Sequence, residues 1–201
     1  MSLHIHRVYT KIGDDGLTQL MGSPRVPKHS LPIECLGACD ELCAFIAMIS
    51  IHLKAVKTKK VFSGQIIKLL TQIQNDVFDI GYIVTHSKLS AHDAQSVFPT
   101  NKVDLLEKWL DTWSSELPPL MSFILGGGGI LSGSTHVART ICRKTERLFW
   151  AYQKKRRLPL SCLKYLNRLS DFLFVLARKL AFTFHENETL WNIPKIPHRK
   201  K

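Results

Sequence analysis

The chain has 201 residues, of which 45% are hydrophobic, and a formal charge of +12 from 28 basic and 16 acidic residues. This length suits one domain or at most two, and the hydrophobic fraction excludes a globally disordered chain. The positive charge favours anionic partners such as nucleic acid, a phospholipid surface or a small polyphosphate.

The cysteines and the apolar pattern indicate a cellular compartment. Five cysteines, three of them recurring every four residues, make a poor disulfide framework, so we expect a reducing compartment, by default the cytoplasm. We find no secretory signal or transit segment, and no apolar run that approaches the roughly 18 residues of a membrane span. We therefore expect no membrane partner.

The predicted elements begin with an irregular N-terminal segment, residues 1–32, whose Gly, Pro, Thr, Ser and charged residues are typical of a loop with a short strand. Five stretches with apolar residues at helical spacing follow, joined by short connections except for polar segments at 54–60 and 86–101. We expect helices over residues 33–52, 63–84, 102–116, 130–157 and 160–184. The sequence thus predicts an all-α, five-helix antiparallel bundle in a single domain over residues 1–192, followed by a basic, flexible tail at 193–201.

The fourth predicted helix carries Arg139, Arg143 and Arg147 at spacing i, i+4 and i+8, so the three guanidinium groups share one face. Like charges at this spacing repel one another unless an anion lies against them, and Glu146 can neutralise only part of the charge. The guanidinium group also matches phosphate through two parallel hydrogen bonds. This face predicts a phosphate chain or an acidic partner helix, and the alternative is a solvated basic surface with ordinary ion pairs.

The N-terminal segment reads T-K-I-G-D-D-G-L-T-Q from Thr10 to Gln19, and Lys28 lies a little further on. Two glycines, two hydroxyl groups and a lysine in this stretch can form a nest of backbone N–H groups for phosphate. The alternative is an ordinary β-turn with Asp14, Asp15 and Gly16 as turn residues.

Four glycines, residues 126–129 of the stretch FILGGGGILSGS, precede the arginine-bearing helix. Such a turn lets backbone N–H groups point at an anion or a planar ligand, or it is only a flexible connection between helices. Neither the P-loop pattern GxxxxGK[ST] nor a strand-led GxGxxG is present, so both familiar nucleotide fingerprints are excluded.

Polar residues on the other predicted helices add candidates. Asn167 and Asp171 are four residues apart and can align on one stripe, where Asn167 would bond a ligand or a neighbouring helix. Asp40 and Glu41 lie among apolar residues and need a basic partner, which the arginine-bearing helix offers. The cysteines of the first helix share one face but lack the second pair typical of structural zinc sites, so we expect no direct protein ligands for a metal.

Taken in order, the motifs TKIGDDGLT, CDEL, FILGGGG, ARTICRKTER and YLNRLSDFLFVLAR resemble those of the PduO-type ATP:cob(I)alamin adenosyltransferase family. The usual family pattern is TKTGDKGTT, VDELNA, FILPGG, ARTVCRRAER and YLNRLSDLLFVLAR. The likeness covers about residues 9–191, and five ordered motifs are far more specific than any one of them. It implies a five-helix bundle assembled as a homotrimer, with ATP and cobalamin as substrates bound at subunit interfaces and Mg²⁺ bound through the ATP phosphates.

The resemblance also assigns roles to residues of this chain. Arg143 and Phe123 are the candidate catalytic residues, Phe123 as the aromatic residue that crowds the lower face of the corrin. Arg139 would pair with Asp40 across the subunit interface. The candidate ATP-binding residues are Thr10, Lys11, Ile12, Gly13, Thr18, Gln19, Lys28, Arg143, Lys144, Thr145, Glu146, Arg147 and Asn167.

The implied reaction needs no protein nucleophile, because the cobalt of cob(I)alamin attacks C5′ of ATP and triphosphate leaves. Arg143, Lys28 and Mg²⁺ would stabilise the charge of the leaving group. Phe123 would displace the lower axial base and so give a four-coordinate Co(II) that is easier to reduce. An electron-donating reductase is a further expected partner, and in a eukaryote the expected location is the mitochondrial matrix.

The chain departs from the family pattern at positions around the implied ligands, and two alternatives follow. We expect ATP binding to be retained, but a catalytically weakened member that binds ATP and adenosylcobalamin as a carrier or chaperone is the first alternative. The second is a basic nucleic-acid-binding bundle built on residues 154–157 and the tail. It lacks interleaved aromatic residues for base stacking, so we expect no nucleic-acid partner. The departures are Ile12, Asp15, Gln19, Gly126, Lys144, Thr145 and Cys43.

Overall fold

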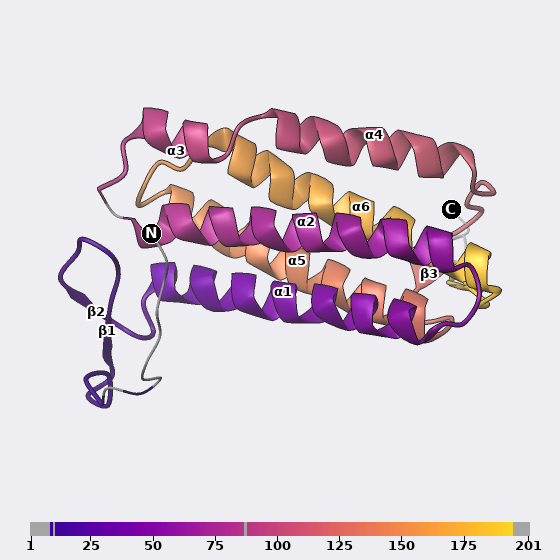
Figure 1. Ribbon diagram of the computed structural model, residues 1–201, viewed down its shortest axis with the longest axis horizontal. Coiled ribbons are helices and arrows are strands. Elements are labelled where there is room, and N and C mark those ends of the chain that lie inside the picture. Colours follow the sequence, from indigo (N-terminus) through magenta and orange to yellow (C-terminus); the bar gives the residue numbers. More distant parts are fainter. Residues whose placement is uncertain (1–8, 10, 87, 195–201) are drawn as a thin grey trace, which may run out of the picture.

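The structure is a computed structural model that describes residues 9, 11–86 and 88–194. Five long helices and one short helix make up most of this part of the chain (Figure 1). They are α1 (Leu31–Ala55), α2 (Lys60–Thr85), α3 (Ala91–Val97), α4 (Asn101–Ser115), α5 (Ile130–Gln153) and α6 (Leu160–Phe184). The prediction of an all-α bundle with five long helices is confirmed, with helix ends that differ by a few residues.

The short helix α3 lies in the segment 86–101 that the sequence predicts as a polar loop. Ser90 begins it, because its Oγ accepts a hydrogen bond from the Asp93 backbone N–H at 3.1 Å and donates one to Asp93 Oδ2 at 2.6 Å. A serine followed three residues later by an acid is a capping signal, and it marks the start of this helix.

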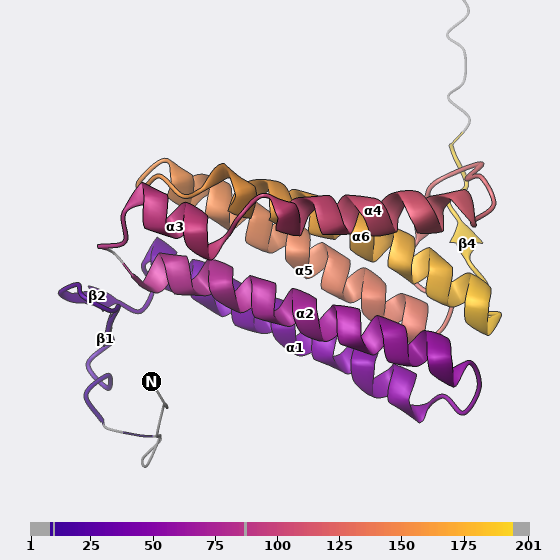
Figure 2. The same cartoon turned by 45° about the horizontal axis from the view of Figure 1, so that its top comes forward.

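The arginine-bearing helix α5 lies between two other helices of the bundle, α1 and α6 (Figures 1 and 2). Helix α1 packs against α2 and α5, α5 also packs against α6, and α6 packs against α4. Helices α1, α4 and α6 run in one direction and α2 and α5 in the other. The start of α5 therefore meets the end of α6 at one end of the bundle, and the start of α1 lies at the opposite end.

Helix α1 is long and strongly apolar. Among the described helices it is the one whose length and mean hydropathy, 1.6, suffice to cross a membrane, with 44% of that stretch buried inside the protein. The expectation that no apolar run approaches a membrane span is therefore wrong for this helix. The physical reason is that α1 packs on two neighbours at once, so apolar residues such as Leu42, Ile46 and Ile49 cover a wide core face.

A buried polar cluster joins α2, α4 and α6. Asp76 of α2 is 3% exposed; its Oδ1 accepts from Lys102 Nζ at 2.7 Å, and its Oδ2 accepts from Tyr165 Oη at 2.8 Å. Lys102 Nζ also donates to Asp79 at 2.6 Å. Because every partner is satisfied, the cluster holds α4 against the bundle without leaving an unpaired buried charge.

Two small antiparallel strand pairs lie at opposite ends of the bundle. The N-terminal hairpin pairs β1 (Leu17–Gln19) with β2 (Arg25–Pro27) and projects beyond the end where α1 begins (Figure 1). At the other end β3 (Ile124–Leu125) pairs with β4 (Thr189–Leu190). The predicted tail lies outside the described residues from position 195 onward.

Candidate active site

The arginine face of α5, which we define as Arg139, Arg143 and Arg147, is open to solvent. Arg143 and Arg147 are exposed and Arg139 is half-buried. Within the described part of the chain, none of the three guanidinium groups forms an ion pair with a carboxylate. Burial and the neighbouring charge of Arg143 lower the pKa of Arg139. This face thus carries positive charge that an anionic ligand would stabilise.

A neutral histidine supports the first arginine of this face. Arg139 Nε donates to His136 Nδ1 at 3.4 Å, and His136 is 4% exposed. Burial and the charge of Arg139 lower the pKa of His136 to about 4. The imidazole therefore stays neutral near pH 7, so it adds no further positive charge to the face.

Helix α6 brings its predicted ligand residue to the arginine-bearing helix. Asn167 Nδ2 donates to Glu146 Oε1 at 3.2 Å, which places the two candidates together on neighbouring helices. Asp171 Oδ2 accepts from Arg168 at 3.0 Å. Both nearby carboxylates thus already have partners, and neither pairs with the arginine face.

Two residues that the resemblance assigns to ATP binding do not lie on the arginine face. Thr145 is 0% exposed, and its hydroxyl donates to the carbonyl oxygens of Ala38 at 3.2 Å and Ile141 at 3.0 Å. The position therefore faces α1 in the core and not the arginine face, where a bound ATP is expected. Lys144 lies at the surface, but its Nζ forms an ion pair with Glu41 of α1 at 2.9 Å and does not join the arginine face.

In the N-terminal loop, the predicted phosphate-binding residue Lys28 lies next to Gly13. A Cβ added at Gly13 would lie 3.2 Å from Lys28 Nζ, so the ammonium group rests against the loop backbone. The Lys28 backbone N–H donates to the Gly16 carbonyl oxygen at 2.9 Å. Lys11 adopts a left-handed conformation at φ 61°. Thr10 lies outside the described residues.

Arg25, the first residue of β2, contacts this loop and was missed by the sequence interpretation. Its guanidinium group donates to both carboxylate oxygens of Asp15, at 2.9 and 2.6 Å, and to the Ile12 carbonyl oxygen at 2.5 Å. The hydrogen bonds from Arg25 hold the pKa of Asp15 below its usual value. The negative charge that Asp15 adds near the predicted phosphates is therefore matched by an arginine. The hairpin register, which sets Gln19 opposite Arg25, brings it there.

The other predicted residues of the hairpin lie on its strands. Thr18 is half-buried opposite Val26, and Gln19 Nε2 donates to the Ser23 carbonyl oxygen at 3.3 Å. The hairpin packs mainly on itself and not on the helices of its own chain. It is therefore a projecting element whose ligand-facing residues need a second surface.

The glycine run already has an anion against it. Glu186, just after α6, accepts hydrogen bonds from the backbone N–H groups of Leu131 at 3.1 Å and Ser132 at 2.9 Å. The N–H groups of Leu131 and Ser132 are therefore not free for a ligand anion, because the carboxylate of Glu186 occupies the N-terminus of α5. Phe123, directly before β3, is 75% exposed.

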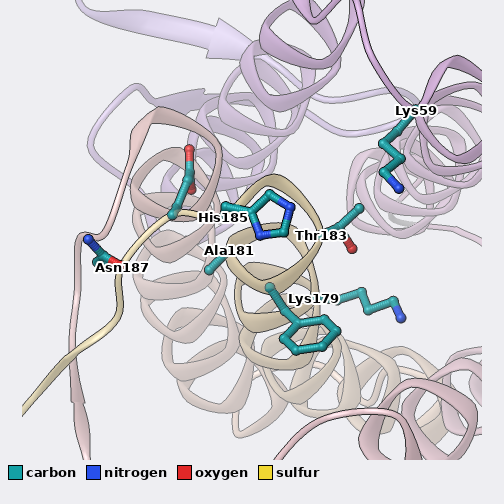
Figure 3. A pocket seen from close by; sticks show the side chains of 8 residues that line it. Lys59, Lys179, Ala181, Thr183, His185 and Asn187 are labelled. Carbon is teal, nitrogen blue, oxygen red and sulfur yellow. The ribbon is translucent and has the colours of Figure 1, made fainter.

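A cavity of about 480 Å³ lies near this end of the bundle, between the start of α2 and the end of α6 (Figure 3). Lys59, Lys179, Thr183, His185 and Asn187 are among the residues that line it. No predicted ATP-binding residue lines this cavity, so it is not the site that the sequence indicates. The described residues also contain no group of three or more His, Cys, Asp and Glu side chains arranged to hold a metal ion.

Comparison with known proteins decides the family. The sequence profile described as cobalamin adenosyltransferase matches residues 8–180. The chain belongs to the cobalamin adenosyltransferase family. The predicted family and enzyme class are confirmed.

Relatives span nearly the whole chain. It is 39% identical over 197 residues to the corrinoid adenosyltransferase of Mycobacterium leprae, covering 95% of this chain and 98% of that protein. It is 34% identical over 191 residues to the corrinoid adenosyltransferase of Homo sapiens, covering 93% of this chain and 74% of that protein.

A solved structure shares the fold. A variant of the PduO-type ATP:corrinoid adenosyltransferase from Lactobacillus reuteri, complexed with cobalamin and ATP, superposes with a TM-score of 0.79 at 25% identity. The match covers 93% of this chain and 100% of that chain.

Proposed function

We propose that this protein transfers the 5′-deoxyadenosyl group of ATP to the cobalt of cob(I)alamin, giving adenosylcobalamin and triphosphate. The observation that carries the proposal is the arginine face of α5, whose guanidinium groups have no carboxylate ion pair among the described residues. A triphosphate supplies the anion that such a face needs. The family of the chain and the cobalamin and ATP in the similar structure support the same reaction.

ATP binding in this proposal uses two separate parts of the chain. The N-terminal hairpin and its loop contribute Lys11, Ile12, Gly13, Thr18, Gln19 and Lys28, together with Thr10. The helices contribute Arg143, Arg147, Glu146 and Asn167, with Lys144 at the margin because it pairs with Glu41.

The two parts come from different subunits of a homotrimer. The hairpin projects beyond its own bundle, and the arginine face is an open surface that cannot enclose a nucleotide by itself (Figure 1). Arg139 and Asp40 have no ion-pair partner within the described residues of one chain, which supports a pair between Arg139 and Asp40 of neighbouring subunits.

The chemistry of the step is a displacement at C5′ of ATP. The Co–C5′ bond forms with the electron pair of cob(I)alamin, and the bond from C5′ to the triphosphate oxygen breaks with its electron pair on the triphosphate. The protein supplies no nucleophile. Arg143 and the ammonium group of Lys28 stabilise the developing negative charge, and the rest of the site orients the ribose.

Mg²⁺ would be held through the phosphate oxygens of bound ATP and would neutralise part of the leaving-group charge. The two carboxylates next to the arginine face already have partners, because Glu146 accepts from Asn167 and Asp171 accepts from Arg168, so the phosphates are the anionic ligands that remain for the ion. Phe123, an exposed aromatic ring, is the residue that would lie against the lower face of the corrin.

The cellular setting of the proposal is a reducing compartment, the cytoplasm or, in a eukaryote, the mitochondrial matrix. The five cysteines are free and buried, which supports that setting. A reductase supplies the electron that converts Co(II) to Co(I).

The test mixes the protein with ATP, Mg²⁺ and chemically reduced cobalamin and follows the absorbance change as the Co–C bond forms. Arg143→Ala is expected to lower kcat/KM by about a hundredfold or more, because charge stabilisation in the transition state is lost. Lys57→Ala is the control: it removes one exposed positive charge from the α1–α2 connection, far from the hairpin, and is expected to keep the wild-type rate.

The outcomes separate the candidate functions. Wild-type turnover in Arg143→Ala would contradict the role of that residue. ATP binding without turnover in the wild type would favour the carrier, and absence of ATP binding would contradict both.

A further inference from the structure

The segment that follows α6 contacts the residues directly before and directly after Phe123 in the chain. We define this segment, residues 186–191, as the C-terminal strap. Its first residue, Glu186, accepts hydrogen bonds from the backbone N–H groups of Leu131 and Ser132 at 3.1 and 2.9 Å. These groups are free donors at the N-terminus of α5, and a carboxylate is the side chain that satisfies them best. The strap therefore fixes the start of the arginine-bearing helix.

The glycines before α5 fit closely around the strap. A Cβ at Gly129 would lie 2.1 Å from Glu186 Cδ, and a Cβ at Gly128 would lie 2.8 Å from the Asn187 carbonyl oxygen. Gly128 also has φ +104°, a conformation that favours glycine. The glycine run is thus shaped to receive the strap.

The last residue of the strap contacts Phe123 directly. The backbone N–H of Trp191 donates to the Phe123 carbonyl oxygen at 2.7 Å, and Ser122 Oγ donates to the Trp191 carbonyl oxygen at 2.8 Å. The ring centroids of Trp191 and Phe123 are 6.0 Å apart, within the range of favourable aromatic pairs. Between these contacts β4 pairs with β3, in the register Ile124 to Leu190.

A third tie joins the strap to the segment that leads to Phe123. Arg178 of α6 is 9% exposed, and its Nη2 donates to the Pro118 carbonyl oxygen at 2.8 Å. Its Nε lies 3.5 Å from Glu188 Oε1. The same buried guanidinium group thus anchors the strap and the chain ahead of Phe123 to one point on α6.

We propose that the C-terminal strap positions the Phe123 ring, and through it the corrinoid, with Glu186 and Trp191 as positioning residues. The ring is 75% exposed, so the core does not hold it; the contacts that locate it come from the strap. The arginine face begins at Arg139, about two helical turns beyond Leu131, so the strap acts on the corrinoid side and not on ATP. This inference rests on the proposed function of Phe123.

The test uses Glu186→Ala, which removes both acceptor oxygens, and Trp191→Ala, which removes an exposed ring and keeps the backbone hydrogen bond. Glu186→Gln retains one acceptor oxygen and is the conservative variant. Asp104→Ala, an exposed carboxylate on α4, is the matched control. Three quantities are measured on the full chain: hydrogen exchange of the amides of residues 122–132 without ligands, the ATP dissociation constant, and kcat and KM for the corrinoid.

The expected result is a selective loss. Glu186→Ala and Trp191→Ala should speed exchange of these amides by about tenfold. They should raise KM for the corrinoid by about tenfold while the ATP dissociation constant stays within about twofold of the wild type. In the presence of ATP, bound cob(II)alamin should show less of the four-coordinate signal. Glu186→Gln should recover part of each effect, and Asp104→Ala should show none.

Other results overturn the inference. Unchanged exchange in both variants would show that the strap does not hold this segment. An equal loss of ATP and corrinoid binding would show a general effect on the fold. Positioning by the strap and adenosyl transfer are tested by separate measurements. Faster exchange in a variant that is as stable as the wild type supports positioning even if the wild type transfers no adenosyl group. That absence of transfer would contradict the proposed function alone.

Discussion

Replacing His136 by glutamine should remove a pH dependence from the free energy of unfolding. Burial and the charge of Arg139 lower the pKa of His136 from 6.5 to about 4. Between these two pH values the imidazole is protonated in the unfolded chain and stays neutral in the folded protein. The stability that the neutral imidazole contributes is therefore fully present above about pH 6.5 and is lost as the pH falls towards about 4.

The size of the effect follows from the two pKa values. Between about pH 7.5 and about pH 5, one group with these values lowers the free energy of unfolding by about 2 kcal/mol. Urea unfolding followed by circular dichroism at constant ionic strength measures this loss. The wild type should lose about 2 kcal/mol more than His136→Gln over this range.

Other titrating groups are common to both proteins and cancel in the comparison. His29→Gln, which removes an exposed histidine from the connection between β2 and α1, serves as the control for the loss of a histidine elsewhere in the chain. Equal losses in the wild type and His136→Gln would refute the reasoning, because the imidazole would then titrate alike in the folded and unfolded states.

Three further predictions concern the interior. Asp76→Ala should lower the free energy of unfolding by about 3 kcal/mol, because Lys102 and the buried Tyr165 hydroxyl lose their acceptor; a loss below about 1 kcal/mol in urea unfolding would contradict the role of the cluster. Thr145→Val should cost about 1 kcal/mol of stability and leave the ATP dissociation constant unchanged by calorimetry, since the hydroxyl bonds only core carbonyl groups; a large rise in that constant would return Thr145 to the ATP site. The buried thiols should resist iodoacetamide in the folded protein at about pH 8 and react after unfolding, because burial raises their pKa, to about 12 for Cys35 and Cys162; rapid labelling of the native protein would show that these sites open.

The helices and the arginine face were accessible from the sequence because both depend on local spacing. Apolar residues at helical intervals predict each long helix, and the i, i+4, i+8 spacing places Arg139, Arg143 and Arg147 on one face in any straight helix. The five ordered motifs carried the family. The short helix α3 was also signalled locally, by Ser90 and Asp93, but its few residues did not stand out from a polar segment.

Contacts between distant segments were not accessible in this way. Thr145 and Arg143 lie two residues apart in the same motif, yet one faces the core and the other the solvent, because α1 packs on only one side of α5. Arg25 neutralises Asp15 only because the hairpin register brings them together.

The sequence by itself determined the family, the helical content and the row of like charges, all of which depend on residue type and on neighbours within a few turns. Only the tertiary structure decided that Glu186 occupies the N-terminus of α5 and that Trp191 lies against Phe123. The physical reason is that these contacts join segments more than fifty residues apart, and no local propensity records which carboxylate or ring the folded chain brings to a given backbone group.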